Sequence, residues 1–282
     1  MDPINWYPGH MKKTRTLIQE NLKMVDAVLE VIDARIPRSS RNPMLGELLA
    51  GKPEILVFNK CDLADPEVTN RWQAAFRRED FRSCAVESLT GRGMKELFIM
   101  LTALEDRRRR AAPGSAKARK PLRLMIVGVP NVGKSSLINR LTGKKSTRTG
   151  NKPGVTRGKQ WLTLKNGMQL LDTPGILQPK LASPEVGEHL AFCGSIRDEI
   201  LDLDTLGLDL IRLLSDRYPD LLKARYGLDE VPEDGLEAME AICRKRGFIM
   251  PGKRLDYTRC ARTVIDEFRE GKIGRISLEE AE

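Results

Sequence analysis

The sequence predicts an α/β fold, with a mostly parallel sheet and helices on both faces, followed by a small all-helical domain. Over the first 180 residues, short apolar segments rich in β-branched residues alternate with segments of helical character, as in a covered parallel sheet. Beyond residue 180 the strand pattern stops and helical periodicity continues. We therefore expect one domain over residues 1–180 and a second, helical domain over residues 181–282.

Each element is expected from a local pattern. A short basic helix is expected at residues 10–24, and buried strands at residues 24–33, 54–60, 84–88 and 122–128. Residues 161–172 predict a hairpin with Asn166–Gly167 at its turn. A run of arginines without apolar periodicity predicts an exposed linker at residues 105–121. Later helices are expected within residues 196–226, 235–247 and 259–271.

The composition bounds the class of protein. Of the 282 residues, 40% are hydrophobic and 31% charged, which is typical of a soluble globular protein. The sequence has no apolar run that could cross a bilayer and no secretory signal, so we expect a cytoplasmic protein without a membrane partner. The five scattered cysteines lack zinc-site spacing and are expected to be reduced thiols. A net charge of +9 and a pI of about 9.4 favour a nucleic-acid partner without requiring one.

A phosphate-binding loop is the strongest local signal. Gly128, Gly133, Lys134 and Ser135 fit the pattern G-x-x-x-x-G-K-S, between an expected strand and a helical segment. In such a loop backbone N–H groups surround the phosphates, the lysine reaches the β- and γ-phosphates, and the serine hydroxyl ligates Mg²⁺. The expected phosphate-binding residues are Asn131, Val132, Gly133, Lys134, Ser135 and Ser136.

Two further motifs would complete the phosphate side. Asp172, which begins the DTPG motif at the end of the expected hairpin, would hold Mg²⁺ through water, and the Gly175 N–H would meet the γ-phosphate. Thr156 is the expected switch threonine for Mg²⁺ and the γ-phosphate. Ser135, Thr156 and Asp172 thus form the candidate Mg²⁺ site, and Lys134 and Thr156 are candidate catalytic residues.

A guanine-reading loop is expected at Asn59-Lys60-Cys61-Asp62, directly after the strand at 54–60. The Asp62 carboxylate would accept hydrogen bonds from guanine N1–H and the exocyclic amine. Adenine lacks both donors, and leaving that carboxylate unpaired would disfavour it by up to about 10⁴-fold. Asn59 would brace the loop and contact the base, and the Lys60 stem would lie over the ring. A third base loop, contacting the base through a backbone N–H, is expected at Glu87, Ser88 and Leu89.

The order of the motifs is unusual, because the guanine loop precedes the phosphate loop. Both loops can serve one site if the chain is circularly permuted, since the nucleotide loops of such a fold all lie at the carboxyl edge of the strands. The linker at 105–121 would then join the former chain ends. The sequence thus predicts a circularly permuted P-loop GTPase domain whose second switch leads directly into the helical domain.

This arrangement resembles the circularly permuted GTPases of ribosome assembly, most closely the ribosome biogenesis GTPase A family. The resemblance rests on the nucleotide motifs and on NWYPGHM (5–11), DARIPRSSRNP (33–43), GVTRG (154–158), HLAFCGSIRDE (189–199) and FREGKIGRISLE (268–279). It implies GTP hydrolysis, binding to the immature large ribosomal subunit and its rRNA, a nucleotide-timed switch late in assembly, and an RNA-contacting helical domain. We also expect a monomer without a DNA partner.

Hydrolysis needs a substitute for the usual glutamine. Ile176 follows the switch II glycine, where many GTPases carry a Gln that orients water. Even with Gln, small GTPases alone turn over on the order of 10⁻⁴ s⁻¹, so an activating partner is expected. The resemblance implies that His10 is brought to the water and that Asn131 lies where related GTPases hold K⁺. The alternative for His10 is a surface residue, and His189 is expected to be structural.

Basic residues near the last expected helices could contact RNA phosphates: Arg244, Lys245, Arg246, Lys253, Arg254, Arg259 and Arg262. A solvated basic face is the alternative. Two other functions stay open, a regulatory GTPase acting on a non-ribosomal protein or RNA target and an RNA-binding scaffold with a vestigial nucleotide site. The intact Lys134, Ser135, Thr156 and Asp172 argue against the scaffold.

Overall fold

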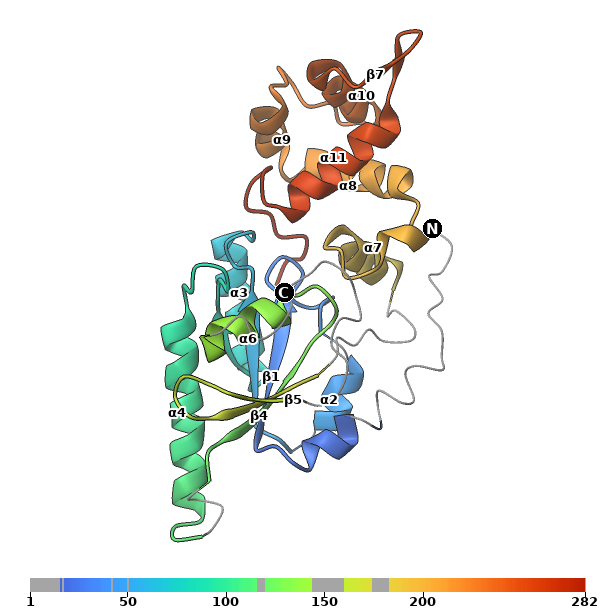
Figure 1. Cartoon of the computed structure of the whole chain (residues 1–282). Coiled ribbons are helices and arrows are strands. Elements are labelled where there is room, and N and C mark those ends of the chain that lie inside the picture. Colours follow the sequence, from blue (N-terminus) through green and yellow to red (C-terminus); the bar gives the residue numbers. More distant parts are fainter. Residues whose placement is uncertain are drawn as a thin grey trace. The chain divides into compact units, whose positions relative to one another are not determined.

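The computed structural model describes residue 16 and residues 18–41, 43–49, 51–115, 120–143, 160–173 and 183–281 (Figure 1). Its contacts divide the chain into two compact units, Met1–Gly187 with Ser277–Glu282, and Glu188–Ile276. The sequence placed the boundary at residue 180 and assigned everything after it to the second domain. The last residues group with the first unit because Leu278 is buried and its N–H donates to the Arg35 carbonyl oxygen at 2.8 Å.

The first unit is built on a six-stranded sheet in the order β3-β2-β1-β4-β6-β5. The strands are β1 (Ala27–Asp33), β2 (Glu54–Asn59), β3 (Arg82–Ala85), β4 (Arg123–Val127), β5 (Gln160–Thr163) and β6 (Gln169–Asp172). All neighbours pair in parallel except β5 and β6, which form the predicted antiparallel hairpin. The predicted α/β class with a mostly parallel sheet is confirmed.

The sheet grows outward from its middle in two halves. The chain runs from β1 through β2 to β3 at one edge, then returns to β4 beside β1, forms β5 at the other edge and comes back as β6 between β5 and β4. Strand order therefore reverses between β1 and β4. In open α/β sheets, ligands bind outside the carboxyl ends of the strands at such a switch point. The loops after β1 and β4 both begin there.

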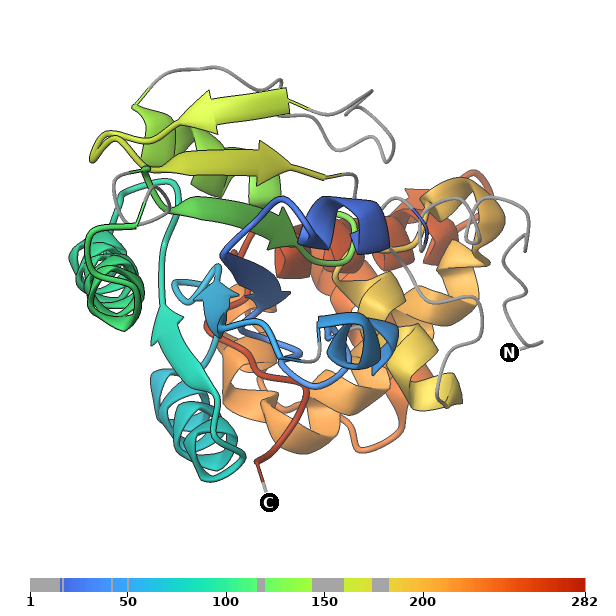
Figure 2. The same ribbon diagram turned by 90° about the horizontal axis from the view of Figure 1, so that it is seen from below.

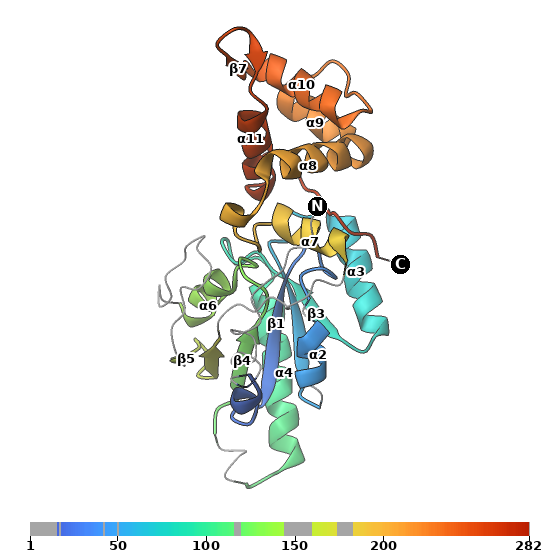
Figure 3. The ribbon, with the colours of Figure 1, turned by 90° about the vertical axis from the view of Figure 1, so that its right-hand side faces the viewer.

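Helices cover both faces of the sheet (Figures 2 and 3). Residues 18–22, α2 (Pro43–Leu49) and α3 (Pro66–Arg78) cover one face, where alternate residues of β1 and β2 such as Val28 and Phe58 enter their cores. The opposite face is covered by α4 (Met94–Ala111) and α6 (Lys134–Thr142), whose leucines are buried. Burying both faces explains why the parallel strands are apolar on both sides.

Two predicted boundaries were wrong. The linker expected from residue 105 is helical as far as Ala111, because Arg108 forms hydrogen bonds with neighbouring segments instead of remaining solvated. Its guanidinium donates to Asp26 Oδ2 at 2.8 Å and to the carbonyl oxygens of Lys120 and Pro121. The third strand is Arg82–Ala85 rather than 84–88, because only these residues pair with β2. Residues 86–88 belong to the loop that follows.

The second unit is a helical bundle with one small hairpin. After α7 (Pro184–Phe192) it contains η1 (Asp198–Ile200), α8 (Leu203–Arg217), α9 (Pro219–Tyr226), α10 (Gly235–Arg246), β7 (Ile249–Met250), β8 (Arg254–Leu255) and α11 (Tyr257–Arg269). Helices α8 and α11 pack closely, since a Cβ at Gly207 would lie 2.4 Å from that of Ala261. The two-residue strands are the exception to the predicted all-helical domain.

Two further observations concern membrane-spanning helices and the cysteines. Within the described ranges no helix is long and apolar enough to cross a membrane. All five cysteines are free thiols, and four of them are buried.

Candidate nucleotide site

The phosphate loop, residues 128–133, connects β4 to the first turn of α6. Its backbone has positive φ angles at Gly128 (150°), Asn131 (61°) and Gly133 (91°). A Cβ at Gly133 would lie 2.2 Å from the side-chain nitrogen of Asn59. Only glycine therefore lets the phosphate loop approach the predicted guanine loop this closely.

Lys134, the first residue of α6, is buried beneath the phosphate loop. Its Nζ donates to the carbonyl oxygens of Gly128 at 2.9 Å and Val129 at 2.8 Å. Burial lowers the pKa of Lys134 from 10.5 to about 8, although the Asp172 carboxylate opposes the shift. Phosphate oxygens would be stronger partners than neutral carbonyls, because both groups of the hydrogen bond would then be charged.

Asp172 ends β6 beside β4 and is buried. Among the described residues, its Oδ2 atom has no hydrogen-bond partner. Burial raises the pKa of Asp172, while Lys134 and the Thr173 N–H oppose the rise. An orphaned carboxylate oxygen beside Lys134, the residue before Ser135, suits Mg²⁺, which takes oxygen ligands and usually keeps several waters. The described residues contain no group of three His, Cys, Asp or Glu side chains that could hold a metal alone.

Asn59 joins three loops. Its Nδ2 donates to the Val132 carbonyl oxygen of the phosphate loop at 2.7 Å. Its Oδ1 accepts from the Ser88 hydroxyl at 2.6 Å and from the Ser88 N–H at 3.3 Å. The side chain is 2% exposed, so these bonds form away from water. The guanine loop, the phosphate loop and the third base loop thus meet at one amide, whatever their order in the chain.

Lys60 is held by a charge cluster that the sequence analysis missed. Lys60 has a left-handed backbone (φ 59°), and its Nζ lies 3.0 Å from Asp33 Oδ2. Asp33 also accepts from Arg35 Nε at 3.0 Å and Nη2 at 2.9 Å, and both residues are buried. Burial alone would raise the pKa of Asp33, but the charges of Arg35 and Lys60 outweigh it and the pKa falls.

The third base loop lies against α6. Arg140 donates through Nε to the Ser88 carbonyl oxygen at 3.0 Å and through Nη2 to that of Leu89. The Glu87 carboxylate lies 3.6 Å from Arg92 within the same loop. Because the Ser88 N–H is engaged by Asn59, the next N–H along the loop is that of Leu89, whose side chain is 76% exposed.

The carboxyl-terminal segment of the first unit also braces this side. The Glu279 carboxylate accepts from the N–H groups of Arg38 at 2.6 Å and Ser39 at 2.9 Å. The Asp65 N–H, three residues beyond Asp62, donates to the Ser277 hydroxyl oxygen at 3.2 Å. Asp62 itself is half-buried. The sequence held no signal for these contacts, because their partners are more than two hundred residues apart.

Comparison with known proteins identifies the family. A family model described as 50S ribosome-binding GTPase matches residues 123–230. Ribosome biogenesis GTPase A of Priestia megaterium is 44% identical over 278 residues, which cover 98% of this chain and 96% of that protein. The chain belongs to the ribosome biogenesis GTPase A family. Mitochondrial ribosome-associated GTPase 1 of Bos taurus is 34% identical, with 99% of this chain and 89% of that protein covered.

Solved structures agree with this assignment to the ribosome biogenesis GTPase A family. The GNP-bound crystal structure of YlqF from T. maritima matches with a TM-score of 0.66 and 30% identity over 96% of this chain and 99% of that one. A GDP-bound YlqF structure matches with a TM-score of 0.68 and 29% identity over 94% of this chain and 98% of that one. The predicted resemblance and fold are therefore both confirmed.

Several predicted site residues of this family member lie outside the described residues. They are His10, Thr156 and Gly175, together with Ile176 of the second switch. The geometry therefore brings together the guanine loop, the third base loop, the phosphate loop and Asp172. The predicted roles of the other four residues stay predictions. His189, expected to be structural, is buried in α7.

The predicted basic cluster of the second unit is partly neutralised. Three of its members form ion pairs: Arg244 with Glu240, Lys245 with Asp229, and Arg246 with Glu267. Lys253, Arg254 and Arg262 are exposed. Asp and Glu outnumber Lys and Arg in residues 188–276, so the net charge of +9 comes from the rest of the chain.

Proposed function

We propose that this protein is a GTP-hydrolysing switch that binds the immature large ribosomal subunit, acts late in its assembly, and responds to the particle by hydrolysing GTP faster. The observation that carries the nucleotide part is the Asn59 side chain, which joins the guanine loop to the phosphate loop and to Ser88. The ribosomal part is supported by the family, whose members are named for ribosome biogenesis. We infer that the protein works as a cytoplasmic monomer.

The base is read on the side of β2. The Asp62 carboxylate accepts from guanine N1–H and the exocyclic amine, and the Lys60 stem covers the ring while Asp33 holds its ammonium group. We assign the N–H that meets the guanine carbonyl oxygen to Leu89, because Asn59 engages that of Ser88. The proposed contact is thus one residue beyond Ser88 in the chain. The Glu87 carboxylate then pairs with Arg92 rather than with the base.

The phosphates are held on the side of β4. Lys134 exchanges the carbonyl oxygens of Gly128 and Val129 for β- and γ-phosphate oxygens, and the loop N–H groups of residues 131–136 surround the phosphates. Ser135, Asp172 and Thr156 would hold Mg²⁺. When bound, Mg²⁺ neutralises phosphate charge that develops during transfer. The Gly175 N–H meets the γ-phosphate.

Hydrolysis is slow alone, because Ile176 offers no hydrogen bond to water. His10 supplies the missing group once the ribosomal particle fixes it near the γ-phosphate. Asn131, whose left-handed backbone turns the phosphate loop, would hold K⁺ beside the phosphates. The exposed Lys253, Arg254 and Arg262 of the second unit contact rRNA phosphates, mainly through shape and backbone rather than base edges.

The test is GTP turnover in K⁺ buffer by the whole protein alone, with large subunits, and with small subunits. Stimulation by large subunits only, lost in His10→Ala without loss of GTP affinity, is the expected result. An equal rate in Na⁺ and K⁺ would remove the K⁺ role of Asn131. Turnover that neither subunit stimulates would contradict the ribosomal switch and favour a regulatory GTPase with another target.

A further inference from the structure

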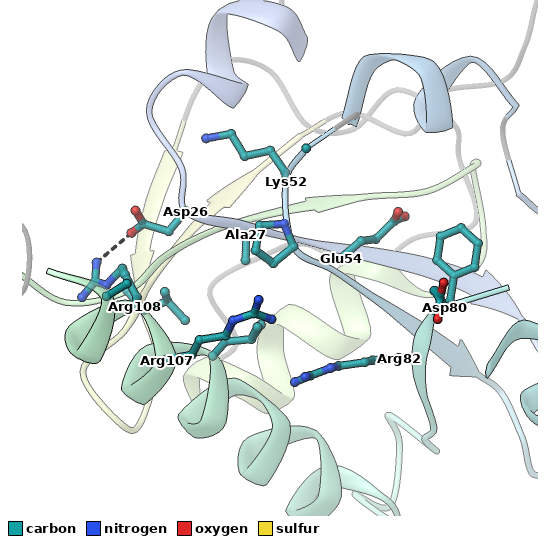
Figure 4. A pocket seen from close by; sticks show the side chains of 14 residues that line it. Asp26, Ala27, Lys52, Glu54, Asp80, Arg82, Arg107 and Arg108 are labelled. Atoms are coloured by element: carbon teal, nitrogen blue, oxygen red, sulfur yellow. Dashed lines mark hydrogen bonds and ion pairs between the residues drawn. The ribbon is translucent and has the colours of Figure 1, made fainter. Parts of the chain in front are cut away.

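A cleft of about 530 Å³ lies at the end of the sheet opposite the nucleotide loops (Figure 4). It is lined by the residues that begin β1, β2 and β3, by the last turns of α4, and by Leu122 before β4. The nucleotide loops follow the other ends of these parallel strands. This cleft is therefore separate from the nucleotide site, and nothing in the proposed GTP chemistry uses it.

The charges in the cleft do not balance. Arg82 and Arg107 extend from opposite sides into the space below Ala27 (Figure 4). Both are exposed, and neither forms an ion pair or a side-chain hydrogen bond with any described residue. Arg108 and Asp26, by contrast, neutralise each other at 2.8 Å. Asp80 at the rim leaves the positive charge in excess.

Two buried polar atoms beside the cleft also lack hydrogen-bond partners among the described residues. They are Arg108 Nε, a donor, and Glu54 Oε1, which lies 3.8 Å from Arg41 Nη2 in a long ion pair. Their side chains are 13% and 10% exposed. Burial and the neighbouring Glu30 raise the pKa of Glu54, while Arg41 opposes the rise, so the negative charge that would offset the arginines of the cleft is disfavoured. Buried groups of this kind are normally satisfied by water or by a ligand.

We propose that this cleft is a second RNA-binding surface, in which Arg82 and Arg107 hold adjacent phosphates of an rRNA strand. The inference rests on the ribosomal partner of the proposed function and names a surface for it. The cleft volume falls within the range of sites that hold ligands of nucleotide size. Phe81, Pro53 and Leu104 supply an apolar wall against which a sugar or base can pack.

RNA fits this surface better than a free phosphate ester does. Two further exposed cations lie beyond the residues that line the cleft. They are Arg110, at the end of α4, and Lys120, which precedes β4 in the chain. A single small ligand would not need charge outside the cleft, whereas a strand carries a phosphate at every nucleotide. The charge excess of the chain also lies outside residues 188–276, so the first unit is the more attractive to RNA.

The test compares two charge-reversal double variants of the full-length protein. Arg82→Glu/Arg107→Glu alters the cleft, and Arg77→Glu/Lys95→Glu makes the same change in net charge at exposed positions of α3 and α4 away from it. Binding to large subunits is measured across KCl concentrations. We expect the cleft variant to bind about tenfold more weakly or worse and its log–log salt slope to fall by about 2, one unit per lost phosphate contact.

Three controls separate the outcomes. Affinity for GDP should be unchanged in both variants, since neither touches the nucleotide loops. If the wild-type protein does not bind large subunits, the proposed function fails; if it binds and both variants weaken equally, only the cleft is excluded. AMP is titrated as a small phosphate ester: binding of AMP that the cleft variant abolishes, with subunit binding retained, would replace RNA by a free nucleotide.

Discussion

The two sides of the nucleotide site are built differently. On the base side, the side chains of Asn59, Lys60 and Asp33 each have protein partners within 3.0 Å, Asn59 in Val132 and Ser88, and Lys60 in Asp33. On the phosphate side, Lys134 rests on carbonyl oxygens of its own loop and Asp172 keeps an orphaned oxygen among the described residues. The residues that support the base side, Asn59, Lys60 and Asp33, are therefore satisfied without nucleotide, whereas Lys134 and Asp172 on the phosphate side are not.

This difference separates recognition from switching. A network whose groups are satisfied keeps one shape with or without ligand, so the base side can select guanine at little cost in ordering. Buried charges that lack good partners are stabilised by whatever ligand supplies them, so the phosphate side is where GTP, GDP and Mg²⁺ can change the protein. The variants below test this contrast from both sides.

Lys134→Met should give the largest effect. It should weaken GTP binding, yet it should not lower the stability of the protein without nucleotide. The variant loses charge-assisted bonds to phosphate, so GTP affinity should fall by at least about 100-fold. Without nucleotide it removes an ammonium group whose lowered pKa shows that burial costs more than its contacts, Asp172 included, return, so unfolding free energy at neutral pH should stay equal or rise by up to about 3 kcal/mol. Thermal unfolding with and without GTP and Mg²⁺ measures both, and Lys95→Met, on the exposed start of α4, is the control.

A Lys134→Met protein that is less stable than wild type without nucleotide would contradict the contrast. It would mean that the two carbonyl contacts already satisfy the ammonium group.

Asp33→Asn should lower the stability of the folded protein, because it removes the negative charge that pairs with Arg35 and Lys60 on the base side. The change leaves Arg35, which is 1% exposed, without its countercharge, and should cost about 3–5 kcal/mol of unfolding free energy. The pKa of Asp33 is depressed, so its contribution is present above its ordinary value of 3.8 and is lost as the pH falls through the lower, folded value. Wild type should therefore lose stability in acid more steeply than the variant does.

Urea unfolding at several pH values measures this effect. Glu79→Gln is the matched control, because its pair with Arg38 is exposed on both sides and should contribute little. Equal losses in the two variants would show that the base-side network is not a buried support.

The sequence predicted the parts of the site that are local. A phosphate loop, a guanine loop and a hairpin turn are each set by a few adjacent residues, and the carboxyl-edge rule predicts that the nucleotide loops meet at one edge of the sheet. The anchoring of Lys60 by Asp33 was not predicted, because an Asp at a strand end has many uses. The arginine run was misread because a charge run is usually solvated, whereas Arg108 is fixed by three acceptors.

The phosphate side should also show a pH dependence of its own. The pKa of Lys134 falls from 10.5 in the unfolded chain to about 8 in the folded protein, so between these values the unfolded state binds more protons. Stability without nucleotide should therefore rise as pH increases from about 8 to 10.5, by on the order of 3 kcal/mol from this group. Other groups titrate there too, so the quantity to measure is wild type minus Lys134→Met. A difference that does not change with pH would show that Lys134 is not destabilised by burial.

Glu279→Gln should give the smallest effect and should show whether the terminal segment belongs to the base side. The Glu279 carboxylate accepts two backbone N–H groups, and an amide can accept only through its single oxygen. We expect a loss of about 1–2 kcal/mol in unfolding free energy. Amide hydrogen exchange at residues 277–281 and at 38–39 should quicken together, because each segment holds the other in place.

Glu280→Gln is the neighbouring control, since its contact with Arg71 is exposed and should contribute little to stability. If exchange quickens at 277–281 alone, the segment rests on the first unit without supporting it, and the base side is complete without its terminal residues.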